Sequence, residues 1–355
     1  MKNIVKVACA LSVAATAAHA GGIQRSGDKS QILFEEGENY VEFSFSTVSP
    51  NVSGSVAGGA VQSGNIQKSY EGFELGWKRQ VNDQLSFAIY SQETVGADVS
   101  YVAGTPYPFS GSNAQVESLA VTGLVKYDFT PRISAYGGLR LQSLKGNVNI
   151  VTAGLPLPPN YSLSVNEDYQ AGYVLGAAYQ IPDIAMKFAV TYESEIEHSF
   201  RDNTGTPFDV TIPQAVTIHA QSGIAKDTLI FGSARWQEWT KFEIRPSDFL
   251  GGAVPIASEP SDTWTFEVGV GRRFTENWSG ALTLGYEEDR NDTVGNLSGK
   301  DGFTSFGVAA KYETESWEIT AGIKYFDIGS TATTIGANFS DNDAIAAGVK
   351  VGFRF

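Results

Sequence analysis

The sequence predicts an all-β protein, namely a transmembrane antiparallel β-barrel of about 14 strands with short periplasmic turns and long extracellular loops. Three observations lead to this fold class. The chain opens with a secretory signal, its predicted strands alternate apolar and polar residues, and its connections alternate between long and short. The high content of Gly, Tyr, Phe and Trp also suits strands with a small-residue lumen face and aromatic girdles at the membrane surfaces.

Residues 1–20 have the features of a secretory signal peptide. Lys2 and Lys6 precede an apolar run, and Ala18-His19-Ala20 provides a small-x-small cleavage site. The apolar run is too short to span a bilayer as a helix. Cys9 lies within the signal, so the mature chain has no cysteine and no disulfide or thiolate metal site. We expect neither a metal nor a cofactor.

The composition after the signal excludes several classes of protein. No later apolar run is long enough for a membrane helix, so strands must make any membrane crossing. Loss of Lys2 and Lys6 changes the formal net charge from −14 to −16, which argues against nucleic-acid binding. We therefore predict a multi-pass protein of the Gram-negative outer membrane, with lipid against its outer face.

The last twelve residues, A-I-A-A-G-V-K-V-G-F-R-F, show the strand pattern most clearly. Alternate side chains of a strand point to opposite faces. One face is apolar as far as Phe355, and the other is small or cationic, with Lys350 and Arg354. This pattern suits a closing strand between lipid and a polar lumen. We expect the barrel-assembly machinery to bind the terminal Phe355.

The other strands follow the same pattern in order along the chain. Their outward apolar residues, strand by strand, begin with Val41, Phe43 and Phe45; Phe73, Leu75 and Trp77; Leu85, Phe87 and Ile89; Leu119, Val121 and Val125; Ile133, Leu139 and Leu141; and Tyr173 and Leu175. Two further strands are expected from Pro213 and from Thr228. The outward residues of the remaining strands are Met186, Phe188 and Val190; Trp264 and Phe266; Leu282 and Leu284; Phe306 and Val308; and Trp317, Ile319 and Ile323.

The connections between these strands alternate in length. Short turns, such as 81–84 and 130–132, should lie in the periplasm, and long loops, such as 94–113, 146–165 and 199–212, should be extracellular. An even strand number places both termini in the periplasm. The predicted organisation is a signal at 1–20, a short N-terminal periplasmic or plug segment at 21–38, and the barrel at 39–355.

The segment 212–242 resembles the FadL/TodX family of outer-membrane transporters for hydrophobic compounds. It has a Pro-led strand, a short turn, and a second strand that ends in the cluster Trp236, Trp239 and Phe242. The next hairpin, W-T-F-E-V-G-V-G-R-R-F-T-E-N-W, and the strand count are also similar to the family. Family members usually open with a long hatch that carries an Asn-Pro-Ala motif, and this motif is absent here.

The resemblance implies transport of long-chain fatty acids or aromatic hydrocarbons. Extracellular loops would capture the apolar ligand, pass it into the barrel and release it sideways into the bilayer. Two loops offer apolar side chains for capture, which otherwise would only pack loop on loop. The candidates are Val148, Ile150, Val151, Leu155, Leu157, Tyr161, Tyr101, Tyr107 and Phe109.

Cations on the predicted lumen face are the second set of candidates, because they would meet a ligand carboxylate. These are Arg140, Lys187, Lys311, Lys324, Lys350 and Arg354. The alternative, which we favour, is that they pair with lumen acids such as Glu74, Glu193, Glu267 and Glu318, because a buried unpaired charge is costly.

Two other functions must be weighed. A general porin for small hydrophilic solutes needs a long polar loop folded into the pore, whereas the long loops here are apolar and rich in Pro and Gly. A lipid-modifying enzyme needs a serine beside a histidine, and neither His198 nor His219 lies in a recognisable motif. We expect no catalysis, apolar small molecules and outer-membrane lipid as partners, and a monomer.

Overall fold

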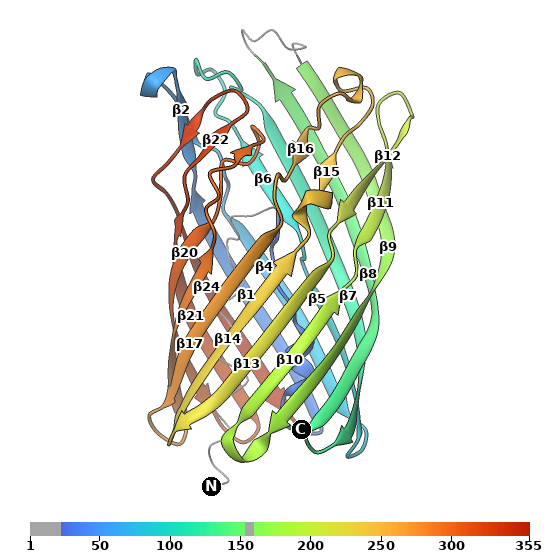
Figure 1. The fold of residues 1–355 in the computed structure, drawn as a ribbon, viewed down its shortest axis with the longest axis vertical. Coiled ribbons are helices and arrows are strands. Elements are labelled where there is room, and N and C mark those ends of the chain that lie inside the picture. The colour runs from blue at the N-terminus through green and yellow to red at the C-terminus, as the bar shows by residue number, and fades with distance from the viewer. Residues whose placement is uncertain (1–22, 153–159) are drawn as a thin grey trace.

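The computed structural model describes residues 23–152 and 160–355, which form a closed antiparallel barrel of fourteen strands (Figure 1). Each strand pairs with its neighbours in the chain, and β1 closes the barrel against β24. The predicted fold class is therefore confirmed. The barrel strands are β1 (Asn39–Asn51), β4 (Tyr70–Gln80), β5 (Leu85–Gln92), β7 (Asn113–Thr130), β8 (Ile133–Val151), β9 (Asn160–Ile181), β10 (Met186–Glu193), β13 (Ala215–Ala225), β14 (Thr228–Gln237), β17 (Thr263–Arg273), β18 (Trp278–Glu287), β20 (Phe303–Glu313), β21 (Trp317–Ile328) and β24 (Asn342–Arg354).

The alternation seen in the sequence sets which face of the barrel meets lipid. Along the closure, Phe43 pairs with Val351 and Phe45 with Val349, and the two Phe side chains are exposed on the outside. Outward positions all round the barrel carry large apolar side chains, whereas the inward ones are polar or small. No helix among the described residues has the length and apolar character needed to cross a membrane.

Smaller elements lie at the end of the barrel that carries the long connections (Figure 1). Five short strands form one sheet there, and two more form a second sheet. They are β2 (Ser53–Val56), β3 (Val61–Asn65), β19 (Thr293–Val294), β22 (Thr331–Thr333) and β23 (Asn338–Phe339), then β15 (Glu243–Ile244) and β16 (Ala257–Ser258). Short 3-10 turns occur at several places in the described chain: η3 (Ser30–Phe34) in the N-terminal segment, η5 (Pro182–Ile184) in the short turn between β9 and β10, and η4 (Ala57–Gly59), η6 (Trp239–Lys241) and η7 (Leu250–Gly252) in the long connections.

Three predicted loops are wrong in extent. Within 94–113 the chain forms β6 (Gly96–Ser100), which pairs with β7. Most of 146–165 belongs to β8 and β9, which stay paired as far as Val151 and Asn160 because their inward apolar residues continue the alternation. Within 199–212 the chain forms a hairpin of β11 (Ile196–Arg201) and β12 (Pro207–Ile212). The strand expected from Pro213 begins at Ala215.

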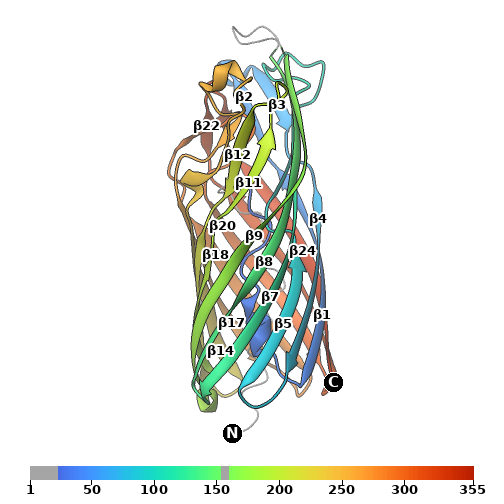
Figure 2. The ribbon, with the colours of Figure 1, turned by 90° about the vertical axis from the view of Figure 1, so that its right-hand side faces the viewer.

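The described part of the N-terminal segment lies inside the barrel. Figure 2 shows its short helical turn, in dark blue, within the lower half of the barrel. Ile32 and Leu33 are buried, and Phe34 packs edge-on against Tyr136 of β8 at a ring distance of 5.8 Å. Lys29 pairs with Glu74 of β4 at 2.5 Å. The segment therefore occupies the lumen and contacts several walls.

Candidate functional site

A cluster of buried apolar side chains fills the mouth of the barrel, at the end with the long connections. It gathers residues from strand ends and loops that are far apart in the chain, and we call it the mouth cluster. Its members include Val48, Ile66, Val95, Val99, Tyr101, Tyr107, Phe109, Leu144, Val148, Ile150, Leu163, Phe200, Phe208, Val210, Trp239, Phe242, Ile256, Phe303 and Phe339.

The predicted capture residues belong to this interior cluster rather than to an exposed landing surface. Tyr101, Tyr107 and Phe109 are at most 4 % exposed, and the rings of Tyr101 and Tyr107 stack at 5.2 Å. Val148 and Ile150 are buried too. The physical reason is that the strands and loops turn these side chains inward.

The other predicted capture residues have different positions. Tyr161 packs against the cluster and donates a hydrogen bond to Asp248 at 2.8 Å. Val151 is half-buried, and its backbone N–H donates to Ser112. Leu155 and Leu157 lie outside the described residues.

Within the mouth cluster lies an apolar cavity of about 130 Å³. Its walls come from the β8–β9 pair, with Val148 opposite Leu163, and from the β11–β12 hairpin, with Phe200 and Phe208. Phe242 closes another side. The sequence argument assigned residues 199–212 to a long loop. The alternation in I-E-H-S-F-R and P-F-D-V-T-I, around a D-N-T-G-T turn, was the signal that could have revealed the hairpin.

Few charged side chains reach this cavity. Arg25, Lys145, Lys300 and the acidic Glu259 lie at its margin. Lys145 is half-exposed and pairs with Glu117 at 2.8 Å. Burial lowers the pKa of Lys300, in the loop before β20, to about 8, and the nearby charge of Arg25 adds to this lowering.

The barrel wall is interrupted beside the cavity, at Glu93–Val95. β5 ends at Gln92, and the chain continues as β6 (Gly96–Ser100), which pairs with β7 but not with β4. The upper part of β4, from Tyr70 to Glu74, pairs only with β1 among the described strands, whereas the residues just before β4 bond to β6, with Gln67 bridged to Val99. We call this interruption the wall break.

The N-terminal segment lines the wall break from inside. Arg25 donates its backbone N–H to the Thr94 carbonyl at 2.9 Å, and Gly96 donates to the Ile23 carbonyl at 2.8 Å. The Arg25 guanidinium lies 3.3 Å from the centre of the Tyr70 ring, the geometry of a cation–π contact. Movement of this segment would therefore change the wall break directly.

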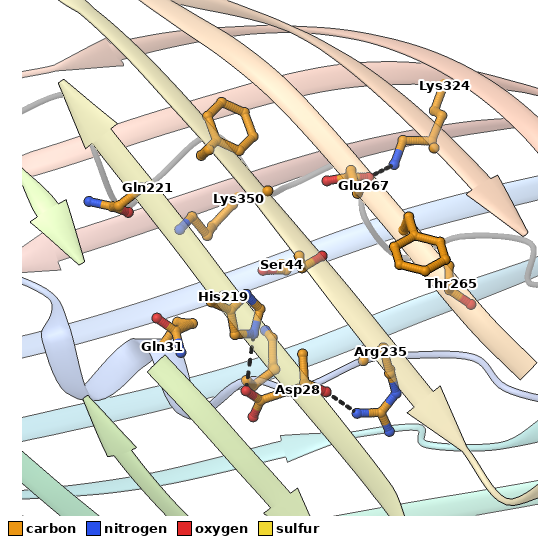
Figure 3. Close-up of a pocket in the computed structure, with 18 of the residues that line it drawn as sticks. Asp28, Gln31, Ser44, His219, Gln221, Arg235, Thr265, Glu267, Lys324 and Lys350 are labelled. Atoms are coloured by element: carbon orange, nitrogen blue, oxygen red, sulfur yellow. Dashed lines mark hydrogen bonds and ion pairs between the residues drawn. The ribbon is translucent and has the colours of Figure 1, made fainter. Parts of the chain in front are cut away.

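Deeper in the barrel lies a polar cavity of about 240 Å³ (Figure 3). The Asp28 carboxylate lies 3.1 Å from His219 Nε2 and accepts hydrogen bonds from the Thr191 hydroxyl and the Ser30 backbone, both at 2.8 Å. On the facing strands, Lys324 pairs with Glu267 (Figure 3). We call this region, with its inward charges, the polar lumen.

The predicted lumen cations all lie in the barrel interior, mostly in ion pairs. Arg140 pairs with Glu193 at 2.7 Å. Lys311 pairs with Glu318 at 2.9 Å, and Arg354 also pairs with Glu318. The remaining contacts are Lys350 with Glu42 at 3.5 Å, Lys324 with Glu267, and Lys187 over the Phe34 ring at 4.7 Å.

Neither histidine has the surroundings of a nucleophile's base. His198 contacts Asp168 and Gln142, and His219 contacts Asp28. A serine–histidine contact is not found for either side chain among the described residues, nor is a group of three or more potential metal ligands.

The profile of the family described as "Outer membrane protein transport protein (OMPP1/FadL/TodX)" matches residues 27–293. The chain belongs to this family. Its members are transport proteins rather than enzymes, and the family places this barrel in the outer membrane of Gram-negative bacteria as a multi-pass protein. The family that the sequence resembled is thus confirmed. No curated protein matches the sequence.

Solved structures of this family show the same fold. A Pseudomonas aeruginosa FadL homologue superimposes with a TM-score of 0.76 at 14 % identity, covering 92 % of this chain and 93 % of the other. For the Pseudomonas putida toluene transporter TodX the TM-score is 0.67 at 13 % identity, with 97 % of each chain covered. The Ralstonia pickettii toluene transporter TbuX gives 0.65 at 11 % identity, covering 94 % and 95 %. At such identities the likeness establishes the fold alone.

Proposed function

We propose that this protein carries small apolar molecules into the outer membrane by binding them in the mouth cluster and releasing them through the wall break. The observation that carries this proposal is the apolar cavity of about 130 Å³ in the barrel mouth. The N-terminal residues Ile23 and Arg25 line this cavity and are also hydrogen-bonded to the backbone at the wall break. The ligand therefore has an apolar site next to an interruption of the wall.

Energetics favour the sideways route over passage down the barrel. Burial of about 100 Å² of ligand surface in the mouth cluster contributes about 2.5 kcal/mol at about 25 cal/mol per Å². Below the cluster the ligand would meet paired charges such as Arg140–Glu193 and Lys324–Glu267, whose hydration it would displace without replacing. The bilayer beyond the wall break is apolar.

The size of the cavity bears on the two ligand classes that the sequence suggested. An engineered apolar cavity of about 150 Å³ binds benzene. The cavity here, about 130 Å³, is of the same order, so it holds one aromatic ring or a short alkyl segment. Two structural relatives carry the description "toluene transporter". We therefore place aromatic hydrocarbons before long-chain fatty acids, whose chains would extend beyond the cavity.

Other parts of the chain have roles that follow from this proposal. Residues 21–38 act as a short plug, supported by the buried contacts of Asp28 and Lys29 with the walls. The exposed ring of Phe355 serves recognition by the assembly machinery, and the barrel works as a monomer. The signal at 1–20 lies outside the described residues.

Uptake into proteoliposomes tests the proposal against the porin alternative. The probes are tritiated toluene, tritiated palmitate and a hydrophilic sugar, and conductance is measured in planar bilayers. We expect uptake of toluene above that of empty liposomes, with no large steady conductance. Steady conductance with sugar flux, and no toluene uptake, would establish a porin.

A cavity-filling substitution locates the site. Leu163→Trp places a larger side chain in the cavity, and we expect it to reduce toluene uptake about tenfold, equivalent to about 1.4 kcal/mol of lost binding. The matched control is Ser164→Trp, because Ser164 is the next residue of β9 and is exposed. Equal uptake by the two variants would show that the cavity is not on the route.

A further inference from the structure

The β11–β12 hairpin is attached to the barrel differently from its neighbours. It forms a separate two-stranded sheet between β10, which ends at Glu193, and β13, which begins at Ala215. Its inward residues Phe208 and Val210 line the apolar cavity. No ladder joins β11 to β9 in the described part of the chain, although the two strands lie side by side in Figure 1. The hairpin therefore forms one wall of the cavity without a strand ladder to the barrel.

Polar contacts at two places replace the missing ladder: Asp202 and Asn203 in the hairpin turn bond to Ser247 and Asp248, and His198 bonds to β9. His198 of β11 is fully buried, and its Nδ1 lies 3.1 Å from Asp168 Oδ2 of β9. The same carboxylate accepts the backbone N–H of Ser199 at 3.3 Å. Across the hairpin His198 is opposite Val210, so the contact with Asp168 and a cavity-lining side chain lie at the same level.

The contact continues along the inner side of the wall to the wall break. His198 Nε2 lies 3.3 Å from Gln142 Oε1 of β8, and Gln142 Nε2 is hydrogen-bonded to the Thr94 hydroxyl. Thr94 is in the wall break, and its carbonyl accepts the backbone N–H of Arg25. A chain of side chains, Asp168–His198–Gln142–Thr94, thus connects the hairpin with the wall break.

Whether the His198 ring is neutral or protonated decides which side chains donate in this series of hydrogen bonds. The Asp168 carboxylate only accepts, so Nδ1 must donate to it. A protonated ring also donates from Nε2 to Gln142 Oε1, and the Gln142 amide then donates to Thr94. A neutral ring must accept at Nε2, so the amide has to turn over and Thr94 becomes the donor. One proton therefore switches the hydrogen bonding of a residue in the wall break.

We propose that His198 is a positioning residue that couples closure of the β11–β12 hairpin over the cavity to the wall break, with looser closure when its ring is protonated. Burial lowers the pKa of His198 by more than the Asp168 carboxylate raises it, so a proton on the ring favours an open hairpin in which water reaches the ring. The groups that face the ring are Asp168 from β9, which carries the charge, with Gln142 from β8 and Phe200 of its own strand. This inference rests on the proposed function for its consequence in transport.

A buried cysteine on the hairpin reports closure independently of transport. Val210→Cys places a thiol at a position that is 4 % exposed, and the matched control Ser199→Cys places one on the exposed face of the same hairpin. Cys9, the chain's one native cysteine, is changed to Ser in both. The ratio of their alkylation rates removes the effect of pH on the thiol itself.

We expect this ratio to fall about threefold to tenfold between about pH 5 and about pH 8, because the ring loses its proton and the hairpin closes. With His198→Asn, which still donates to Asp168 but does not titrate, the ratio should stay flat. A flat or rising ratio in the His198 protein, or the same fall with His198→Asn, would overturn the coupling.

Toluene uptake, measured across the same pH range, completes the test. Uptake should follow the labelling ratio in the native protein and lose its pH dependence in His198→Asn. Uptake that keeps its pH dependence in that variant contradicts the coupling. If the labelling ratio responds to pH as expected while no apolar probe is taken up at any pH, the coupling stands and the transport proposal fails.

Discussion

The mouth cluster and the polar lumen are built from the same strands but by opposite rules. In the mouth, inward positions carry Val148, Ile150 and Leu163, which leave an apolar cavity. Further down the same two strands, β8 presents Arg140, which is paired with Glu193 of β10. An apolar molecule that is stable in the first region meets fixed charges in the second. The difference supports the proposed exit at the wall break, which we place at the boundary between the two regions.

Stability should depend most on the polar lumen. Glu193 contacts both Arg140 and Arg235, and its side chain is 4 % exposed. Glu193→Gln leaves two guanidinium groups without a countercharge, and we expect a loss of about 3–5 kcal/mol in the free energy of unfolding. Thermal unfolding in detergent measures it.

The control is Glu117→Gln, which breaks the half-exposed pair with Lys145 at the margin of the mouth. An exposed ion pair contributes about 0–1 kcal/mol, so this change should be nearly silent. Similar losses for the two variants would mean that the charges of the polar lumen are well hydrated and are no barrier.

A disulfide can lock the wall break, at the boundary between the two regions. Gln24 and Val95 are partners in an isolated antiparallel bridge at the wall break, so cysteines at both positions lie within disulfide reach. With Cys9→Ser, the oxidised Gln24→Cys/Val95→Cys protein should lose most of its toluene uptake, because the N-terminal segment can no longer leave the wall break. Reduction should restore it.

The Gln24→Cys single variant controls for the substitution and for the reductant. Full uptake by the oxidised double variant, with the disulfide verified by mass spectrometry, would show that the ligand leaves by another route.

Alternation along the strands was enough to predict the barrel, because each strand repeats a two-residue period that separates lipid from lumen. The same period predicted that Arg140 and Lys311 point inward. The site was predicted less well. Tyr107 and Phe109 were identified as apolar loop residues, but their burial depends on contacts with distant loops that no local pattern contains. The wall break depends on β6 losing β4 as a partner, which is a property of the closed sheet.

The smallest expected effect concerns Lys300, a cation at the margin of the apolar mouth. Because burial lowers its pKa to about 8, Lys300 is charged below that pH and becomes neutral as the pH rises through it, whereas an ordinary lysine would stay charged. A carboxylate ligand gains from this charge and a hydrocarbon does not.

Between about pH 7 and about pH 9 we expect palmitate uptake to fall by about threefold at most, in line with loss of one partly screened charge interaction. After division by the toluene rate at each pH, which removes the dependence through His198, this fall should remain in the native protein and disappear in Lys300→Met. A palmitate-to-toluene ratio that is flat in both proteins would mean that the mouth recognises only the apolar part of its ligand, which would widen the contrast with the polar lumen.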